Sequence, residues 1–96
     1  MYGVHVEFTI HPGKEADFLE WKRREGELQH RSPGFIKRAM TRDLELPNVF
    51  YFVCFWESKA HHTAFTEDPE FERAIAETRV REAIAERKVA QVTEVF

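Results

Sequence analysis

Two charged residues stand at positions where the surrounding sequence pattern favours apolar side chains. Arg38 shares one face of a predicted strand with Ile36 and Met40, and Glu25 falls within the apolar stripe of the first predicted helix. An arginine can hold a phenolate or enolate oxygen and a carboxylate can accept a proton, so Arg38 and Glu25 are candidate catalytic residues. The alternative is that the two pair with each other or extend to the rim of a pocket.

Two adjacent histidines, His61 and His62, open a short helix predicted after the third strand. An imidazole titrates near neutral pH and is a natural general base. Neighbouring residues on a helix diverge by about 100°, so the two rings are not expected to bind one metal ion. Surface or capping roles are the alternative for both, and we predict no metal site.

Aromatic side chains predict walls for a flat ligand. Phe52 and Trp56 share one face of an apolar strand, while Trp21 and Phe71 lie on the apolar stripes of two predicted helices. Ring stacking and dispersion would bind an electron-rich aromatic molecule there without needing charge. We therefore predict these four as substrate-binding residues, the alternative being that they fill the core.

The sequence indicates no cofactor. Cys54 is the only cysteine and stands between Val53 and Phe55, so we expect a small core residue rather than a nucleophile. The glycines are isolated from one another, and no phosphate-binding or flavin-binding loop is recognisable.

Four predicted strands must position these side chains. The strongest signal is Val49–Trp56, a run of apolar and aromatic residues typical of a strand buried on both faces. Residues 4–10 alternate between apolar and polar, which predicts a strand with one dry face. Residues 35–42 and 89–96 are the other two predicted strands.

Helices are predicted between the strands. Residues 14–29 form the first, Ser58 caps a short helix ending near Thr66, and Asp68-Pro69 opens another that should bend or restart near Arg79. The resulting order is β-α-β-β-α-β. This order predicts an α+β, ferredoxin-like fold, a four-stranded antiparallel sheet with helices on one face.

Length and charge narrow the function classes. The 96 residues predict one domain, residues 1–96, with too little chain to cover both faces of the apolar strand. A second copy of the sheet, and hence a homodimer, is expected. The net charge of −3 gives no basic face for nucleic acid, and no apolar segment is long enough to span a membrane. With no export signal recognised and a single cysteine, we expect a cytoplasmic location.

Several short segments together resemble the antibiotic biosynthesis monooxygenase family. They are Pro33-Gly34-Phe35-Ile36 after the first helix, Trp56-Glu57-Ser58 ending the third strand, Phe65 in the short helix, and Asp68-Pro69-Glu70-Phe71 opening the next helix. The resemblance extends over essentially the whole chain. It implies a dimeric α+β barrel in which two sheets face each other, and it implies activities ranging from cofactor-free oxidation of quinols and aromatic polyketides to heme degradation.

This chain differs from both enzymatic branches at the positions they use. The heme-degrading branch usually has an axial histidine at one of two positions, here Ala74 and Ile75, and an asparagine where this chain has Val6. The polyketide-oxidising branch carries an asparagine at the position of Phe52. The family usually has an aromatic residue where His62 stands, which implies that this side chain points inward.

We hypothesise a small dimeric enzyme that oxidises a quinol or polycyclic aromatic phenol with O2, in a pocket between sheet and helices. Trp56 and Phe52 would form its wall, and Arg38, Glu25 or His62 would handle charge and protons. One alternative is a non-catalytic ligand-binding or assembly module on the same barrel, and another is heme binding through His62. A cavity of roughly 300 Å³ or more beside Trp56 would favour ligand binding over the module.

Overall fold

Four antiparallel strands form one sheet in the computed structural model, which describes residues 1–96. The strands are β1 (Tyr2–Ile10), β2 (Phe35–Arg42), β3 (Val49–Trp56) and β4 (Ile84–Val92). Their order in the sheet is β2-β3-β1-β4, so the two central strands are β3 and β1. The ferredoxin-like prediction is confirmed.

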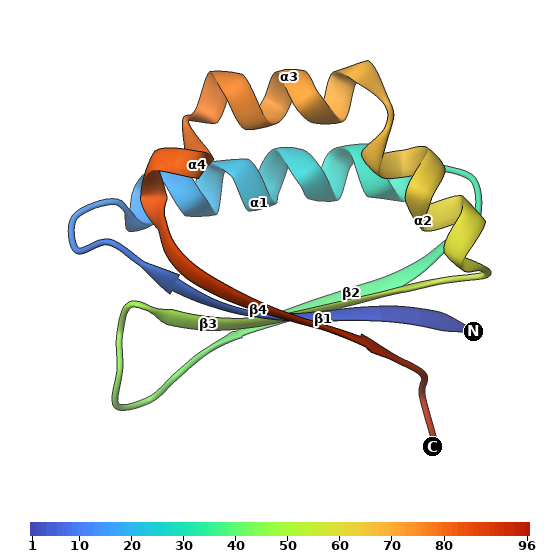
Figure 1. The fold of residues 1–96 in the computed structure, drawn as a ribbon, viewed down its shortest axis with the longest axis horizontal. Helices are drawn as coiled ribbons and strands as arrows, with labels where there is room; N and C mark the ends of the chain where they lie inside the picture. The colour runs from blue at the N-terminus through green and yellow to red at the C-terminus, as the bar shows by residue number, and fades with distance from the viewer.

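All the helices lie on one side of the sheet, as Figure 1 shows. They are α1 (Glu15–His30), α2 (Lys59–Thr66), α3 (Pro69–Thr78) and α4 (Val80–Ala83). The helices α1 and α3 run side by side above the sheet, and α4 leads down into β4. None of these helices combines the length and the apolar character that crossing a bilayer requires.

Local sequence explains where the later helices begin and end. The Ser58 hydroxyl accepts a hydrogen bond from the backbone N–H of His61 and so caps α2. The Asp68 carboxylate caps α3 in the same way, through the N–H of Glu70. Between α3 and α4, Arg79 adopts a left-handed conformation with φ 60° and ψ 30°, which confirms the predicted restart.

The face of the sheet below the helices is largely apolar, and we call it the sealed face because the helices cover it (Figure 1). In the β1–β3 register, Val4 pairs with Cys54, Val6 with Phe52 and Phe8 with Phe50, so these residues share one face as expected. All are buried, together with Trp56 and with Phe18 and Trp21 from α1. The rings of Phe8 and Phe18 lie 5.0 Å apart.

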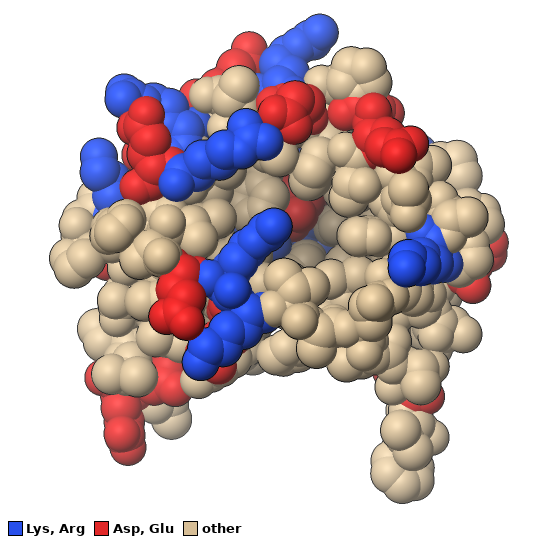
Figure 2. Space-filling model, viewed as in Figure 1, with Lys and Arg blue, Asp and Glu red and all other residues tan.

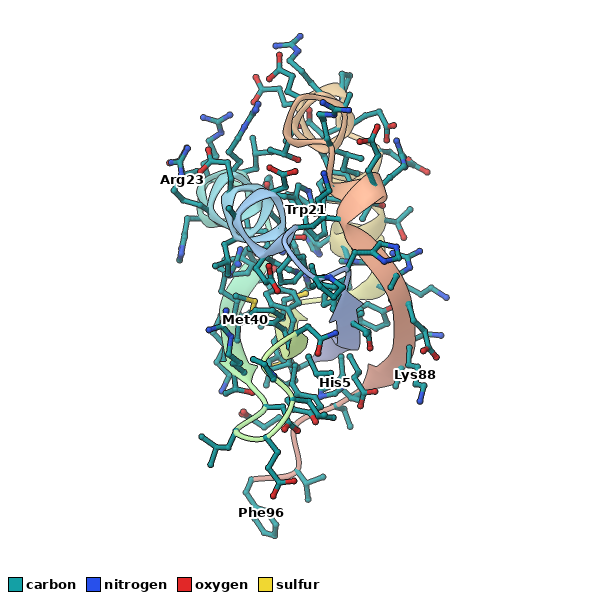
Figure 3. All side chains as sticks on the ribbon, turned by 90° about the vertical axis from the view of Figure 1, so that its left-hand side faces the viewer. His5, Trp21, Arg23, Met40, Lys88 and Phe96 are labelled. Carbon is teal, nitrogen blue, oxygen red and sulfur yellow. The ribbon has the colours of Figure 1, made fainter.

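No helix covers the other face, which we call the open face. The labelled His5 projects from it, on the opposite side of the sheet from Trp21 (Figure 3). From β3, Val53 and Phe55 point to the same side and are only half-buried. The Phe55 ring lies over Gly3, where an added Cβ would sit 2.7 Å from a ring carbon. Glycine therefore makes room for an aromatic side chain over which no helix lies, although the Lys37 ammonium lies 5.3 Å from its ring centroid.

The predicted position of the last strand is wrong. We expected it at residues 89–96, whereas β4 begins at Ile84 and ends at Val92. The segment after Ala83 resembles a helix locally, but it pairs with β1 along most of that strand, from Gly3 opposite Val92 to Ile10 opposite Ile84. The hydrogen bonds and packing of this long ladder outweigh the local helix preference.

A bulge in β2 corrects one further detail. We expected Ile36 to share a face with Arg38 and Met40, but Phe35 pairs with Trp56 and Lys37 with the preceding residue of β3. The register thus passes over Ile36, which is 45% exposed. Arg38 and Met40 remain on the helix-facing side.

Candidate functional site

A cavity of about 720 Å³ lies between the helices and the sealed face of the sheet. Apolar side chains make up 13 of its 22 lining residues, so most of the wall suits an aromatic or aliphatic ligand. Figure 2 shows the hollow from outside, with basic side chains at its rim, while the charged groups farther out gather over the helices. The volume is well above the roughly 300 Å³ that a small-ligand site requires.

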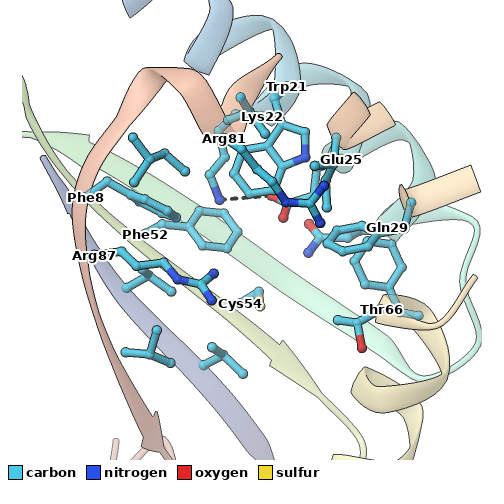
Figure 4. Close-up of a pocket in the computed structure, with 18 of the residues that line it drawn as sticks. Phe8, Trp21, Lys22, Glu25, Gln29, Phe52, Cys54, Thr66, Arg81 and Arg87 are labelled. Carbon is cyan, nitrogen blue, oxygen red and sulfur yellow. Dashed lines mark hydrogen bonds and ion pairs between the residues drawn. The ribbon is translucent and has the colours of Figure 1, made fainter. Parts of the chain in front are cut away.

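Three of the four predicted substrate-binding residues line this cavity. Phe52 comes from β3, Trp21 from α1 and Phe71 from α3, so three different elements build the aromatic wall. The rings of Trp21 and Phe71 lie 6.4 Å apart. Figure 4 shows Trp21 and Phe52 around the same space. The aromatic residues predicted from the sequence therefore converge, with one exception.

The exception is Trp56, which is fully buried and does not line the cavity. Its ring packs between Phe35 and Phe65, at 5.3 and 5.1 Å, and against His62 at 5.7 Å. Its indole N–H donates to the Cys54 sulfur at 3.4 Å. Trp56 thus supports the cavity wall from behind.

His62 lines the cavity, whereas its neighbour His61 does not. The half-buried His62 ring lies against Trp56 and, at 5.8 Å, against Tyr2. Burial lowers the pKa of His62, only partly opposed by the negative charge of Glu25, so the imidazole is neutral at neutral pH. A neutral imidazole facing a cavity can accept a proton.

His61 instead has the capping role considered from the sequence. Its Nδ1 lies 2.7 Å from the hydroxyl oxygen of Ser58, the residue that caps α2. Its ring also lies over Gly34, where an added Cβ would fall within 2.3 Å of the imidazole. His61 therefore stabilises the start of α2, whereas His62 faces the cavity.

Lys22 is a cavity residue that the sequence analysis missed. It is 3% exposed, and its Nζ donates to Glu25 Oε1 at 3.0 Å. The ammonium lies 3.3 Å from the ring centroid of Phe52 and 4.6 Å from that of Trp21. Desolvation by burial lowers the pKa of Lys22 to about 8, although Glu25 opposes the shift.

Arg38 stands behind Glu25 and does not line the cavity. Its Nη1 lies 3.5 Å from Glu25 Oε1 and donates to Gln29 Oε1 at 2.8 Å, while Nη2 donates to the backbone carbonyl of Lys22 at 3.1 Å. Gly26 lets the guanidinium lie against α1, since an added Cβ there would be 2.9 Å from Nη1. We call Lys22, Glu25, Gln29 and Arg38 the buried ionic cluster.

The buried ionic cluster has a signal in the sequence. Phe18, Lys22, Glu25 and Gln29 follow one another at intervals of four, three and four residues, which places them on one face of a helix. Glu25 stands out in this stripe as a carboxylate among apolar residues, whereas the sequence analysis did not single out Lys22 or Gln29, whose residue types are usually exposed. Three polar residues at apolar spacing are the pattern that predicts such a cluster.

Cys54 lines the cavity as a thiol. Burial raises its pKa, and the nearby Trp56 N–H and the cations Lys22 and Arg38 only partly oppose this shift. The side chain is 2% exposed and is not positioned as a nucleophile. No three His, Cys, Asp or Glu side chains converge as metal ligands would.

A comparison with protein families matches the family model for antibiotic biosynthesis monooxygenase over residues 1–77. The match includes β1 to β3 and almost all of α3, and therefore most of the cavity lining. The chain belongs to this family. A search of curated proteins gives no match.

Solved structures agree on the fold. A structure from Nitrosomonas europaea, provisionally described as an antibiotic biosynthesis monooxygenase, is 22% identical to this chain with a TM-score of 0.85. The alignment covers 100% of both chains. A similarly assigned protein from Bordetella bronchiseptica is 26% identical with a TM-score of 0.82, covering 99% of this chain and 97% of that one. SnoaB, a cofactor-independent oxygenase from Streptomyces nogalater, is 18% identical with a TM-score of 0.81, covering 97% and 91%.

Proposed function

We propose that the protein is a cofactor-independent monooxygenase that oxidises a quinol or polycyclic aromatic phenol with O2. The observation that carries this proposal is the cavity itself, a largely apolar space of about 720 Å³ with an imidazole and three members of the buried ionic cluster, Lys22, Glu25 and Gln29, on its wall. Aromatic side chains suit a flat substrate, and acid–base groups suit its deprotonation. The likeness to SnoaB, described as a cofactor-independent oxygenase, supports the proposal.

The reaction needs no electrons from outside the substrate. In an anthrone, a polycyclic phenol in its keto form, the ring CH2 activated by the carbonyl across the ring loses a proton to a base, and the carbanion gives its electron pair to O2. The resulting peroxide anion takes up a proton to give a hydroperoxide, which then loses water, so that CH2 and O2 become C=O and H2O. The protein must hold the ring, accept the proton and stabilise the anion.

His62 is the residue we assign as the base. Its pKa is lowered by burial, so the ring is free to accept a proton at neutral pH, and it faces the cavity. Phe52, Trp21 and Phe71 would hold the ring system. Glu25 lies in the same wall, where its carboxylate accepts a hydrogen bond from the Lys22 ammonium.

Arg38 and Trp56 fit positioning roles. Arg38 holds Glu25 and Gln29 from behind, and Trp56 supports the ring of His62. Neither reaches the cavity. Replacing either is therefore expected to act through the residue that it holds.

An oxygen-electrode assay with dithranol, a dihydroxyanthrone, tests the proposal. The wild-type protein should consume one O2 for each anthrone converted to anthraquinone, and His62→Phe should lower kcat/KM about 10²-fold to 10⁴-fold. His61→Phe is the matched control, since that ring is outside the cavity. Activity should decline as pH falls through the lowered pKa of His62. O2 uptake no faster than in buffer would contradict the proposal.

A second candidate function is a ligand-binding module without catalysis. One observation favours it: at Phe52, where the polyketide-oxidising branch is expected to have asparagine, the ring is covered by the Lys22 ammonium at 3.3 Å. That position therefore offers no hydrogen bond to a substrate. Tight binding of dithranol analogues with no O2 uptake would support the module.

The protein is also proposed to act as a homodimer joined through the open face. Val53 and Phe55 are half-buried there with no helix above them. Beyond β4, Val95 and Phe96 are 80% and 109% exposed, and the chain extends past the sheet on the open side (Figures 1 and 3). A second sheet would bury this apolar surface.

A further inference from the structure

We infer that the ligand of the cavity is an aromatic anion whose charged oxygen accepts a hydrogen bond from the Lys22 ammonium. The inference deepens the proposed function and rests on it only in treating the cavity as a ligand site. It narrows the ligand from any flat ring to one carrying a negatively charged oxygen, either a carboxylate or an ionised phenol.

The first support is an unbalanced charge. The buried ionic cluster contains two cations, Lys22 and Arg38, against the single carboxylate of Glu25, and Gln29 is neutral. Lys22 and Glu25 have side chains only 3% and 7% exposed, and that of Arg38 is 17% exposed. A positive charge left over in such surroundings is costly, and an anion in the adjoining cavity would offset it.

The second support is that donors on this wall lack acceptors. An ammonium has three N–H groups, of which Lys22 uses one for Glu25 while the ring faces of Phe52, Trp21 and Phe8 surround the rest. Ring faces attract a cation but are weaker acceptors than an anionic oxygen. A ligand oxygen would complete the coordination of Lys22.

Trp21 adds an independent observation. Its indole Nε1 is buried and has no hydrogen-bond partner, although the residue lines the cavity. Buried donors are nearly always satisfied, so an unpaired one on a cavity wall indicates a place for a ligand atom or water. The Lys22 ammonium lies over the same indole ring, 4.6 Å from its centroid, and Figure 4 shows both side chains on this wall. A ligand with a second oxygen could satisfy the indole N–H.

The other charged groups of the lining leave this wall positive. Three of the lining residues are acidic, but Glu72 is paired with Arg81 across the rim at 2.9 Å. Glu86 stands opposite Thr9 and hence alternates toward the open face, while Arg87 stands opposite Phe8 on the cavity side, as Figure 4 shows. An entering anion therefore meets Arg87 at the mouth and Lys22 inside.

Two matched probes test the charge directly. Calorimetric titration at neutral pH compares 2-naphthoate with 2-naphthamide, which has the same ring and nearly the same shape but no charge. Wild-type protein should bind the carboxylate at least about tenfold more tightly, the gain typical of a buried hydrogen bond between charged groups. Equal affinity for the two probes, or binding of neither, would overturn the inference.

Two variants should move this preference in opposite directions. Lys22→Met leaves Glu25 and Arg38 as a neutral pair, so it should lose the preference for naphthoate while binding naphthamide within about twofold of wild type. Glu25→Gln removes the carboxylate that competes with a ligand for the Lys22 ammonium and should increase the preference. Lys14→Met, at an exposed position before α1, is the control and should change neither affinity.

The results separate this inference from the proposed function. Neither probe has an oxidisable methylene, so binding is read without turnover. A carboxylate preference that depends on Lys22, with no O2 uptake on dithranol, supports the inference and removes the oxygenase. O2 uptake on dithranol with no preference between the two probes would support the oxygenase and overturn the inference. Should Lys22→Met fail to fold, Lys22→Gln and the wild-type comparison give the same decision.

Discussion

The two faces of the sheet are built by the same strands but end up in different environments. Along β3, Phe50, Phe52 and Trp56 point toward the helices and are at most 3% exposed, whereas Val53 and Phe55 point away and are half-buried. The sealed face is completed within the chain and has room for a cavity. The open face carries apolar side chains beside polar ones such as His5 and Glu7, and no helix covers it (Figure 1). We propose that another molecule buries its apolar part.

The largest effect should come from removing an aromatic ring on the sealed face. Phe50→Ala removes a buried ring that lies 5.0 Å from Phe18, and it should lower the free energy of unfolding by about 3–5 kcal/mol. Phe55→Ala, the same change on the open face, should cost about 1 kcal/mol or less in the monomer. Urea denaturation of both at low protein concentration measures the difference. Equal losses would mean that the faces are not distinct.

A charge on the open face should break self-association. Phe55→Asp would replace an aromatic ring by a carboxylate in the proposed dimer interface and should weaken dimerisation by about two to three orders of magnitude. Sedimentation velocity across a concentration series measures the dissociation constant. The control is Leu19→Asp, which puts the same charge on a 39% exposed position of α1. A wild-type protein that is monomeric at all concentrations would contradict the prediction.

Lys22 should give the sealed face a distinctive pH dependence. Its pKa is about 8 when folded and 10.5 ordinarily, so between these values the unfolded chain holds a proton that the folded protein lacks. Stability therefore rises with pH across this window, by about 3 kcal/mol at most, and Lys22→Met should lack that rise.

The comparison between wild type and Lys22→Met isolates this effect. The Cys54 thiol and the Tyr51 phenol have raised pKa values and make stability fall as pH rises through the same region, but both proteins contain them. Glu25 and Arg38, which face Lys22, are likewise present in both. Parallel stability curves from pH 7 to pH 11 would be inconsistent with a desolvated lysine.

The smallest effect concerns a hydrogen bond beside the open face. The Tyr51 hydroxyl donates to Asp43 at 2.7 Å and is the largest cause of the lowered pKa of that carboxyl. Tyr51→Phe should move the Asp43 titration midpoint upward in an NMR titration. It should stay below the ordinary value, because the backbone N–H groups of Glu45 and Leu46 still donate to the carboxylate. An unchanged midpoint would show that the phenol does not act on Asp43.

The fold was largely predictable because strong periodic patterns specify it. The bounds of β2 and β3 agree with the prediction, and the caps at Ser58 and Asp68 lie where expected. The start of β4 was not predictable from local pattern, since Ala85 and Glu86 favour a helix and only pairing with β1 makes them a strand. Long-range pairing of this kind is invisible to a reading of neighbouring residues.

The candidate site was predicted only in part, because residue spacing marks most of its side chains but does not show which long side chains are buried. The cavity brings together Glu25, His62, Phe52, Trp21 and Phe71, all of which the sequence had marked as candidates. The structure also brings in Lys22, a buried lysine that the sequence analysis did not single out. Whether a long side chain is buried depends on what lies across from it, here the ring of Phe52, and helix spacing gives only the direction in which it leaves the backbone.

The strand order has a consequence for how the protein folds. The central strand β1 has neighbours from both the middle and the far end of the chain, with Gly3 opposite Val92. Closing so long a loop is slow because its entropic cost comes before the contacts that repay it. We expect β1 and β3 to pair earlier and β4 to join late. Since β4 and α4 supply one side of the cavity, the binding site would be the last part of the molecule to form.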